Sequence, residues 1–174
     1  MEFLGASDDV APSRSFRPRQ GSGSKFQAFN VPGTRCLALD HRVEIEAERL
    51  DAGGRSRVGV RVAGLLPYVA LKITAFNDRH HGKDVYDLVY ILLNYAGGVV
   101  EAGRNMASSA VVDDPLVVGA LRLLRDRFAD PGNDAPVAYA SFLGVTDDPD
   151  ALARLRNEAV ETVWRTMEAF DAAR

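Results

Sequence analysis

The chain has 174 residues, of which 47% are hydrophobic and 26% are charged, and its formal net charge is -3. This length and balance are typical of a globular chain with its own apolar core, and they exclude a generic polycationic nucleic-acid binder. The sequence has no apolar run of the roughly 18 residues that a membrane span needs, and its single cysteine, Cys36, excludes an internal disulfide. We expect a cytoplasmic protein without a membrane partner, in which Cys36 fills a small buried apolar position.

The N-terminal segment is expected to be a short strand at residues 1–4 followed by a flexible loop at residues 5–25. The loop is rich in Gly, Ser, Pro and Arg, and it carries a basic group made of Arg14, Arg17, Arg19 and Lys25. Its Gly-Ser-Gly-Ser-Lys run at residues 21–25 has the composition of a phosphate loop. A phosphate loop needs a strand before it and a helix after it, and residues 26–32 show no helical period, so we interpret the run as a linker.

A β-hairpin is predicted next. Residues 34–39 are expected to form a short strand, and residues 43–47 and 58–62 alternate apolar and polar side chains on either side of a Gly-Gly loop. This alternation predicts two antiparallel strands with one face turned inward. Cross-strand pairs between glutamates and arginines account for the outer face. An acid-x-acid metal strand at Glu44 and Glu46 is the alternative.

Residues 65–95 predict a helix, a tight basic turn and a second helix. Val69, Ile73 and Phe76 form the apolar stripe of the first helix, and Gly82 is expected to take the left-handed conformation in the turn. The apolar stripe of the second helix consists of Val85, Leu88, Val89, Leu92 and Leu93.

Five charged side chains gather around this turn. They are Lys72, Arg79, Lys83, Asp84 and Asp87. One interpretation is structural: Lys72 extends along apolar surface to water, Asp84 caps a helix, and the other cations are solvated. The other interpretation is a binding site for a polyanion.

Residues 98–174 predict a chemically quiet helical region. We expect a helix at residues 99–110, a second helix capped by Asp113 or Asp114, a weaker helix or loop at residues 135–143, and a final amphipathic helix of about six turns. Trp164 is interpreted as a packed aromatic residue of the final helix. The predicted buried stripe of the second helix is Leu116, Ala120, Leu123, Leu124 and Phe128.

The string Lys72-(six residues)-Arg79-(three residues)-Lys83-Asp84-Val85-Tyr86-Asp87-Leu88 resembles the second half of the motif set of the AbiEii/AbiGii-type toxin nucleotidyltransferases of type IV toxin-antitoxin systems. The resemblance covers about residues 1–97. It implies an α+β fold, in which residues 1–97 are the C-terminal part of a minimal, polymerase-β-like nucleotidyltransferase core with an antiparallel sheet. Residues 98–174 would be a helical region that packs against this core and offers a surface to an antitoxin or to a second copy.

The resemblance also implies a function and a site. The family transfers a nucleoside monophosphate from an NTP to an acceptor such as tRNA, with Mg²⁺ as cofactor. On the matching positions, Lys72 would neutralise the triphosphate, Arg79 and Lys83 would bind substrate, and Asp84 or Asp87 would orient Lys72 or the acceptor. Glu2 would be a carboxylate on the metal side.

One departure from the family pattern is clear. The family's upstream glycine turn and Asp-x-Asp pair have no counterpart at the matching place, so we expect the truncated C-terminal part of a longer protein, which is a nucleotidyltransferase if these N-terminal motifs are supplied and inactive if they are not. Two alternatives follow. One is a non-catalytic remnant or binding module that pairs with an antitoxin. The other is a metal-dependent hydrolase that uses His80, His81, Asp84 and Asp87.

Overall fold

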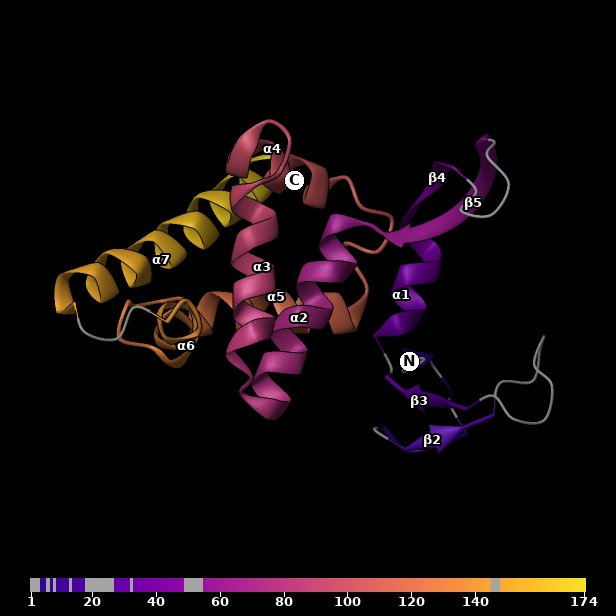
Figure 1. The fold of residues 1–174 in the computed structure, drawn as a ribbon, viewed down its shortest axis with the longest axis horizontal. Helices are drawn as coiled ribbons and strands as arrows, with labels where there is room; N and C mark the ends of the chain where they lie inside the picture. The colour runs from indigo at the N-terminus through magenta and orange to yellow at the C-terminus, as the bar shows by residue number, and fades with distance from the viewer. Residues whose placement is uncertain are drawn as a thin grey trace.

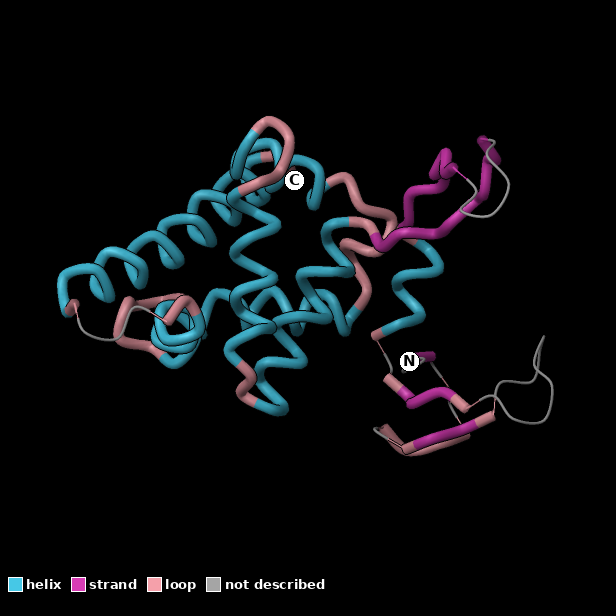
Figure 2. Tube along the Cα trace, in the orientation of Figure 1, coloured by secondary structure: helices cyan, strands magenta, loops and turns pink. Residues whose placement is uncertain are grey.

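The structure is a computed structural model that describes residues 4, 5, 7, 9–12, 14–17, 27–31, 33–48, 55–144 and 148–174. For residues 4, 42–48 and 55–61 it describes the backbone alone. The described chain has an α+β fold in which helices predominate (Figure 2). None of these helices combines the length and the apolar character that crossing a bilayer would require.

The strands form two separate small sheets. In the first sheet, β3 (Ala28–Asn30) pairs in parallel with β1 (Leu4–Gly5) and antiparallel with β2 (Ser15–Phe16). The second sheet is the predicted antiparallel hairpin of β4 (His41–Glu48) and β5 (Arg55–Ala63). Both sheets lie on the α1 side of the helical body (Figure 1). The hairpin prediction is therefore confirmed.

The hairpin register also bears on the predicted outer face. Glu46 lies opposite Arg57, and Glu48 lies opposite Arg55, as cross-strand charge pairs require. The side chains of these residues, and those of Glu44, lie outside the described part of the chain.

Beyond the irregularity between Val43 and Ile45, however, Val43 lies opposite Arg61 and Arg42 lies opposite Val62, which is 49% exposed. The prediction of one inward apolar face is therefore wrong at this end of the hairpin.

The prediction of a strand at residues 34–39 is wrong, because this segment forms helix α1 (Thr34–Leu39). A short apolar run cannot be assigned to strand or helix by periodicity alone. Here the Thr34 hydroxyl donates to the carbonyl of Val31 at 2.7 Å and starts the turn. Cys36 is 2% exposed in the core, which confirms its predicted small apolar role.

The described part of the predicted N-terminal loop contains a strand and fixed contacts, which its composition did not predict. Strand β2 lies inside residues 5–25, and the buried Asn30 side chain bonds the backbone of this segment. Its amide accepts from the Ser7 N–H at 2.8 Å and donates to the carbonyls of Ser7 and Val10. Glu2, Arg19, Lys25 and the Gly-Ser run at residues 21–25 lie outside the described residues.

The predicted helix pair is confirmed as α2 (Leu65–Arg79) and α3 (Gly82–Leu93). The stripe of α2 is fully buried, as are the first four positions of the α3 stripe. Leu93 is the exception at 39% exposed, because α3 ends there.

The turn between α2 and α3 differs from the prediction. His80, with φ of 52°, takes the left-handed conformation, and Gly82 is instead the first residue of α3. A Cβ on Gly82 would lie 3.0 Å from the Ala138 carbonyl oxygen and 3.3 Å from Cβ of Phe142. Glycine at this position therefore allows α3 to approach α6 closely.

The C-terminal region contains α4 (Gly98–Ala107), α5 (Pro115–Arg127), α6 (Asp134–Phe142) and α7 (Pro149–Ala172). Asp114 caps α5 by accepting from the Leu116 N–H at 2.9 Å. Leu116 itself is 44% exposed, so its predicted burial is wrong. The Trp164 indole donates to the Phe128 carbonyl at 2.9 Å, but the residue is 47% exposed, so it is a packed aromatic only in part.

The buried stripe of α5 differs from the prediction at two of its five positions, because the way α5 packs on α2 sets a phase that periodicity does not fix. Leu123 is partly exposed, and the observed stripe consists of Val117, Ala120, Leu121, Leu124 and Phe128.

One apolar core runs across the expected boundary at residue 97. It joins α2 and α3 with helices α4 to α7. At Gly103, α4 packs closely on α7: a Cβ there would lie 2.3 Å from the Thr166 carbonyl oxygen of α7.

We predict that Gly103→Ala destabilises the protein by about 1–3 kcal/mol, because the new methyl group overlaps the α7 backbone. The measurement is the free energy of unfolding by urea. The matched control is Gly119→Ala in α5, where a Cβ meets nothing within 4 Å, and which should stabilise by up to about 1 kcal/mol through helix propensity. Equal effects of the two substitutions would contradict the packing argument.

Candidate functional site

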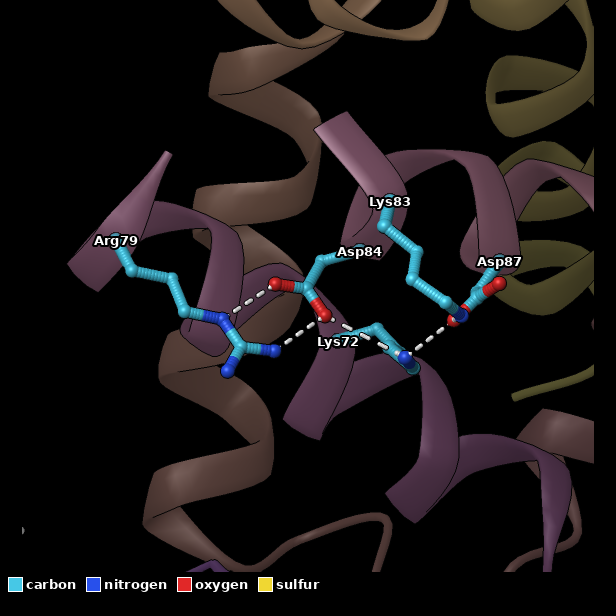
Figure 3. Close-up of polar contacts among 5 residues, drawn as sticks. All are labelled: Lys72, Arg79, Lys83, Asp84 and Asp87. Atoms are coloured by element: carbon cyan, nitrogen blue, oxygen red, sulfur yellow. Dashed lines mark hydrogen bonds and ion pairs between the residues drawn. The ribbon is translucent and has the colours of Figure 1, made fainter. Parts of the chain in front are cut away.

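The five charged residues of the α2–α3 junction form one connected cluster (Figure 3). Lys72 and Arg79 project from α2, and Lys83, Asp84 and Asp87 project from α3. The apolar stripes of the two helices pack against each other and against the core, so the polar side chains meet along the edge of that contact. We call these five residues the junction cluster.

Asp84 is the buried centre of the junction cluster. Its side chain is 2% exposed, although it belongs to the first turn of α3, where a carboxylate usually faces solvent. Arg79 donates to both carboxylate oxygens, from Nε and from Nη2, each at 2.7 Å. Lys72 Nζ adds a longer contact of 3.4 Å. Each carboxylate oxygen is therefore held by a cation, as a buried charge requires.

Asp87 joins the two lysines. Its Oδ2 accepts from Lys72 Nζ at 2.6 Å and from Lys83 Nζ at 2.7 Å. The Asp87 side chain is 18% exposed and that of Lys72 is 22% exposed. Lys83 and Arg79 are more open, at 66% and 56%. The two carboxylates of the cluster are therefore mostly buried, and the side chains of Lys83 and Arg79 are exposed.

The pKa values follow from this geometry. Burial acts to raise the pKa of Asp84, but the hydrogen bonds and charge of Arg79, with Lys72, outweigh burial and lower it. The pKa of Asp87 is also lowered, because its contacts with Lys72 and Lys83 outweigh burial. Burial acts to lower the pKa of Lys72, but Asp87 and its neighbours raise it. All three groups are therefore ionised at neutral pH.

The two aspartates have different surroundings, which the sequence left open. Asp84, and not Asp87, is the more deeply buried, and Arg79 is its main partner. Asp87 makes the shorter contact with Lys72, at 2.6 Å against 3.4 Å for Asp84. Of the residues named for the site, Glu2 alone lies outside the described part of the chain.

One neighbour was missed by sequence reasoning. Lys72 Nζ lies 5.7 Å from the centroid of the Tyr68 ring, and burial raises the pKa of the Tyr68 hydroxyl. The signal was available, because residues four apart on a helix are neighbours. Tyr68 therefore places an aromatic ring beneath the ammonium group of Lys72.

The histidines of the turn do not join the cluster. His80 Nδ1 lies 3.8 Å from Asp134, and its ring contacts Phe76 edge to face. Asp134 also accepts from Arg127 at 2.6 Å. Across the residues that the structure describes, three or more His, Cys, Asp or Glu side chains gather nowhere as a group that could hold a metal. His80, His81, Asp84 and Asp87 therefore do not form the ligand set of the hydrolase alternative.

Magnesium does not fit the described carboxylates of the junction cluster. Mg²⁺ needs free carboxylate oxygens at short range. Both oxygens of Asp84 are bonded by Arg79, and Oδ2 of Asp87 is shared by two lysines. We therefore assign no metal to the junction cluster.

We predict that Asp84→Asn destabilises the protein by about 2 kcal/mol at pH 7, because two cations lose the buried charge that they surround. The folded pKa of Asp84 lies below its ordinary value of 3.8, so the stabilisation is full above that value and is lost as the pH falls through the folded pKa. Urea unfolding at pH 7 and pH 3 should show a smaller difference between wild type and variant at pH 3.

The control for this prediction is Asp171→Asn. Asp171 accepts from Arg125 at 2.6 Å but is 59% exposed, so its loss should change stability at pH 7 by less than about 1 kcal/mol. A pH-independent difference for Asp84→Asn would contradict the electrostatic account.

Comparison of the chain with protein-family models, with curated proteins and with solved structures finds no match. The resemblance to the AbiEii/AbiGii-type toxins therefore depends on the string from Lys72 to Leu88 alone. The function has to be argued from what the side chains of the junction cluster do in three dimensions.

Proposed function

We propose that the junction cluster binds the phosphates of a nucleoside triphosphate, in a nucleotidyltransferase of the AbiEii/AbiGii toxin type. The observation that carries this proposal is the arrangement of three cations around one buried and one half-buried aspartate. Three positive and two negative groups leave one net positive charge on a chain whose total charge is -3. A polyanion is the ligand that this local excess favours.

The exposed cations supply the contacts to phosphate. Lys83 and Arg79 have exposed side chains whose ends reach solvent, and Lys72 is placed between them by Asp87. The fork of Arg79 is held by Asp84 through two of its nitrogens, Nε and Nη2. Because the aspartates fix these side chains before a ligand arrives, little conformational entropy is lost on binding.

In the proposed reaction, the acceptor hydroxyl attacks the α-phosphorus of the NTP, the bond to pyrophosphate breaks, and the hydroxyl proton is released. Charge builds on the phosphate oxygens and on the leaving pyrophosphate, so positioned cations lower the barrier. Lys72 and Lys83 neutralise the triphosphate, and Arg79 assists them. Asp84 and Asp87 orient these cations.

Neither aspartate is assigned the proton of the acceptor. A general base works best when its pKa is close to the operating pH. The pKa values of Asp84 and Asp87 are both lowered by their cationic partners. We therefore give both carboxylates a positioning role, and any Mg²⁺ arrives with the NTP as part of the substrate.

The proposal keeps the remaining expectations of the family resemblance. The sheets at residues 4–63 would belong to a polymerase-β-like core, tRNA would be the acceptor, and the helical region would face an antitoxin. A non-catalytic nucleotide-binding module is the second candidate, favoured by the poor fit of the described carboxylates to magnesium.

We predict that the protein binds ATP, GTP, CTP or UTP with micromolar to millimolar affinity, and that Lys72→Met weakens this binding at least tenfold. A charge-assisted contact to phosphate is worth about 1.5–3 kcal/mol, and tenfold corresponds to about 1.4 kcal/mol. Calorimetric titration with each NTP, in Mg²⁺ and in EDTA, measures the effect.

The matched control is Arg125→Met. Arg125 lies on α5, away from the junction cluster, and pairs with Asp171 of α7. Equal weakening by both variants, or wild-type protein that binds no NTP, would refute the proposal. Transfer of label from an α-labelled NTP to tRNA then separates the two candidates, because a binding module retains nucleotide without labelling RNA.

A further inference from the structure

Three aromatic rings lie beside the junction cluster, two on α3 and one at the end of α6. Tyr90 is 53% exposed and Phe142 is 47% exposed, with the half-buried Tyr86 between them. The Tyr86 ring centroid lies 5.0 Å from that of Phe142 and 5.7 Å from that of Tyr90, with tilted planes. We call these three residues the aromatic shelf.

The shelf has a rigid foundation. Tyr86 also stacks on Tyr139, which is 4% exposed and donates its hydroxyl to Glu158 of α7 at 3.0 Å. Gly82 brings α3 close enough to α6 for Phe142 to reach Tyr86. The rings are therefore held in place before any partner binds.

The shelf and the junction cluster share one helix face. Tyr86 and Asp87 follow Lys83 by three and four residues, and Tyr90 follows them by four and three, so all four lie on one side of α3 within about 10 Å. Asp87 faces Lys72 of α2, and Tyr86 faces Phe142 of α6. The exposed Tyr90 ring therefore lies about two helical turns along α3 from the exposed cation of Lys83, with Tyr86 between them.

We propose that the aromatic shelf stacks the bases of a single-stranded polynucleotide while Lys83 contacts its backbone phosphate. Every base has a flat π face, and exposed rings beside cations are the common device by which proteins hold single strands without reading their sequence. The local positive charge would attract a nucleic-acid strand and an acidic protein surface alike. Only the strand also carries bases that can stack on the exposed rings. The inference rests on the proposed function, because it names the acceptor's position relative to the NTP.

The test uses fluorescence anisotropy of the full chain with a labelled ten-nucleotide oligoadenylate, in ribose and deoxyribose forms, and with the matching duplex. The single strands should bind more tightly than the duplex, whose bases are already stacked. Tyr90→Leu combined with Phe142→Leu keeps apolar surface but removes two rings, and it should weaken single-strand binding at least about tenfold. Equal binding of ribose and deoxyribose strands fits stacking, whereas a strict ribose requirement would overturn it.

The control variant is Trp164→Ala. Trp164 has the same 47% exposure as Phe142 but lies on α7 and contacts Phe128, so strand binding should change by less than twofold. Tyr90→Phe, which keeps the ring, should bind as wild type. Thermal unfolding of every variant confirms that the fold is kept.

The outcomes separate this inference from the proposed function. ATP titration of the Tyr90→Leu/Phe142→Leu variant should match wild type, so strand binding lost with ATP binding kept supports the shelf alone. Strand binding that is unchanged in the variant, or absent in wild type, overturns the inference whatever the ATP result. Shelf-dependent self-association without strand binding would assign the shelf to a second copy of the chain and also overturn it.

Discussion

The packing of α2 against α3 depends on the ion pairs that the buried Asp84 carboxylate makes with Arg79 and Lys72. A charge that is 98% removed from solvent is costly unless each of its oxygens is bonded, and Arg79 supplies both bonds while Lys72 adds a third contact. Arg79 and Lys72 belong to α2 and Asp84 belongs to α3. The ion pairs between them therefore fix the position of one helix relative to the other, both along and around its axis. The buried pair therefore specifies a geometry, and the apolar stripes supply most of the stability.

That geometry explains why exposed and buried charges occur together in one small region. A cation with two fixed carboxylate partners is oriented but keeps donor capacity for a ligand. Lys72 is in this situation between Asp84 and Asp87, with the Tyr68 ring beneath it. Lys83 has one partner and extends furthest toward water. This pre-arranged charge is the basis on which we propose phosphate binding, and the proposal requires no metal ligand from the same carboxylates.

The turn between the helices joins the charged and the aromatic sides of α3. His80 takes the left-handed conformation of the turn, and Gly82 is the first residue of α3, where it contacts α6. A Cβ at position 82 would make tight contacts with Ala138 and Phe142 of α6, so glycine keeps α3 close to the helix that carries Phe142. The turn thus decides whether α3 presents a continuous face with cations at its start and rings at its end.

The sequence by itself determined the elements that depend on local spacing: the hairpin, the stripe of Val69, Ile73 and Phe76, the cap at Asp114, and the five members of the junction cluster. These follow from residues close in the chain, where periodicity and capping act directly. Tertiary structure alone decided the rest. It chose the buried phase of α5, buried Asp84 more deeply than Asp87, and brought Phe142 to Tyr86. Each of these depends on which surfaces meet across long separations in the chain, and a local pattern carries no information about its distant partner.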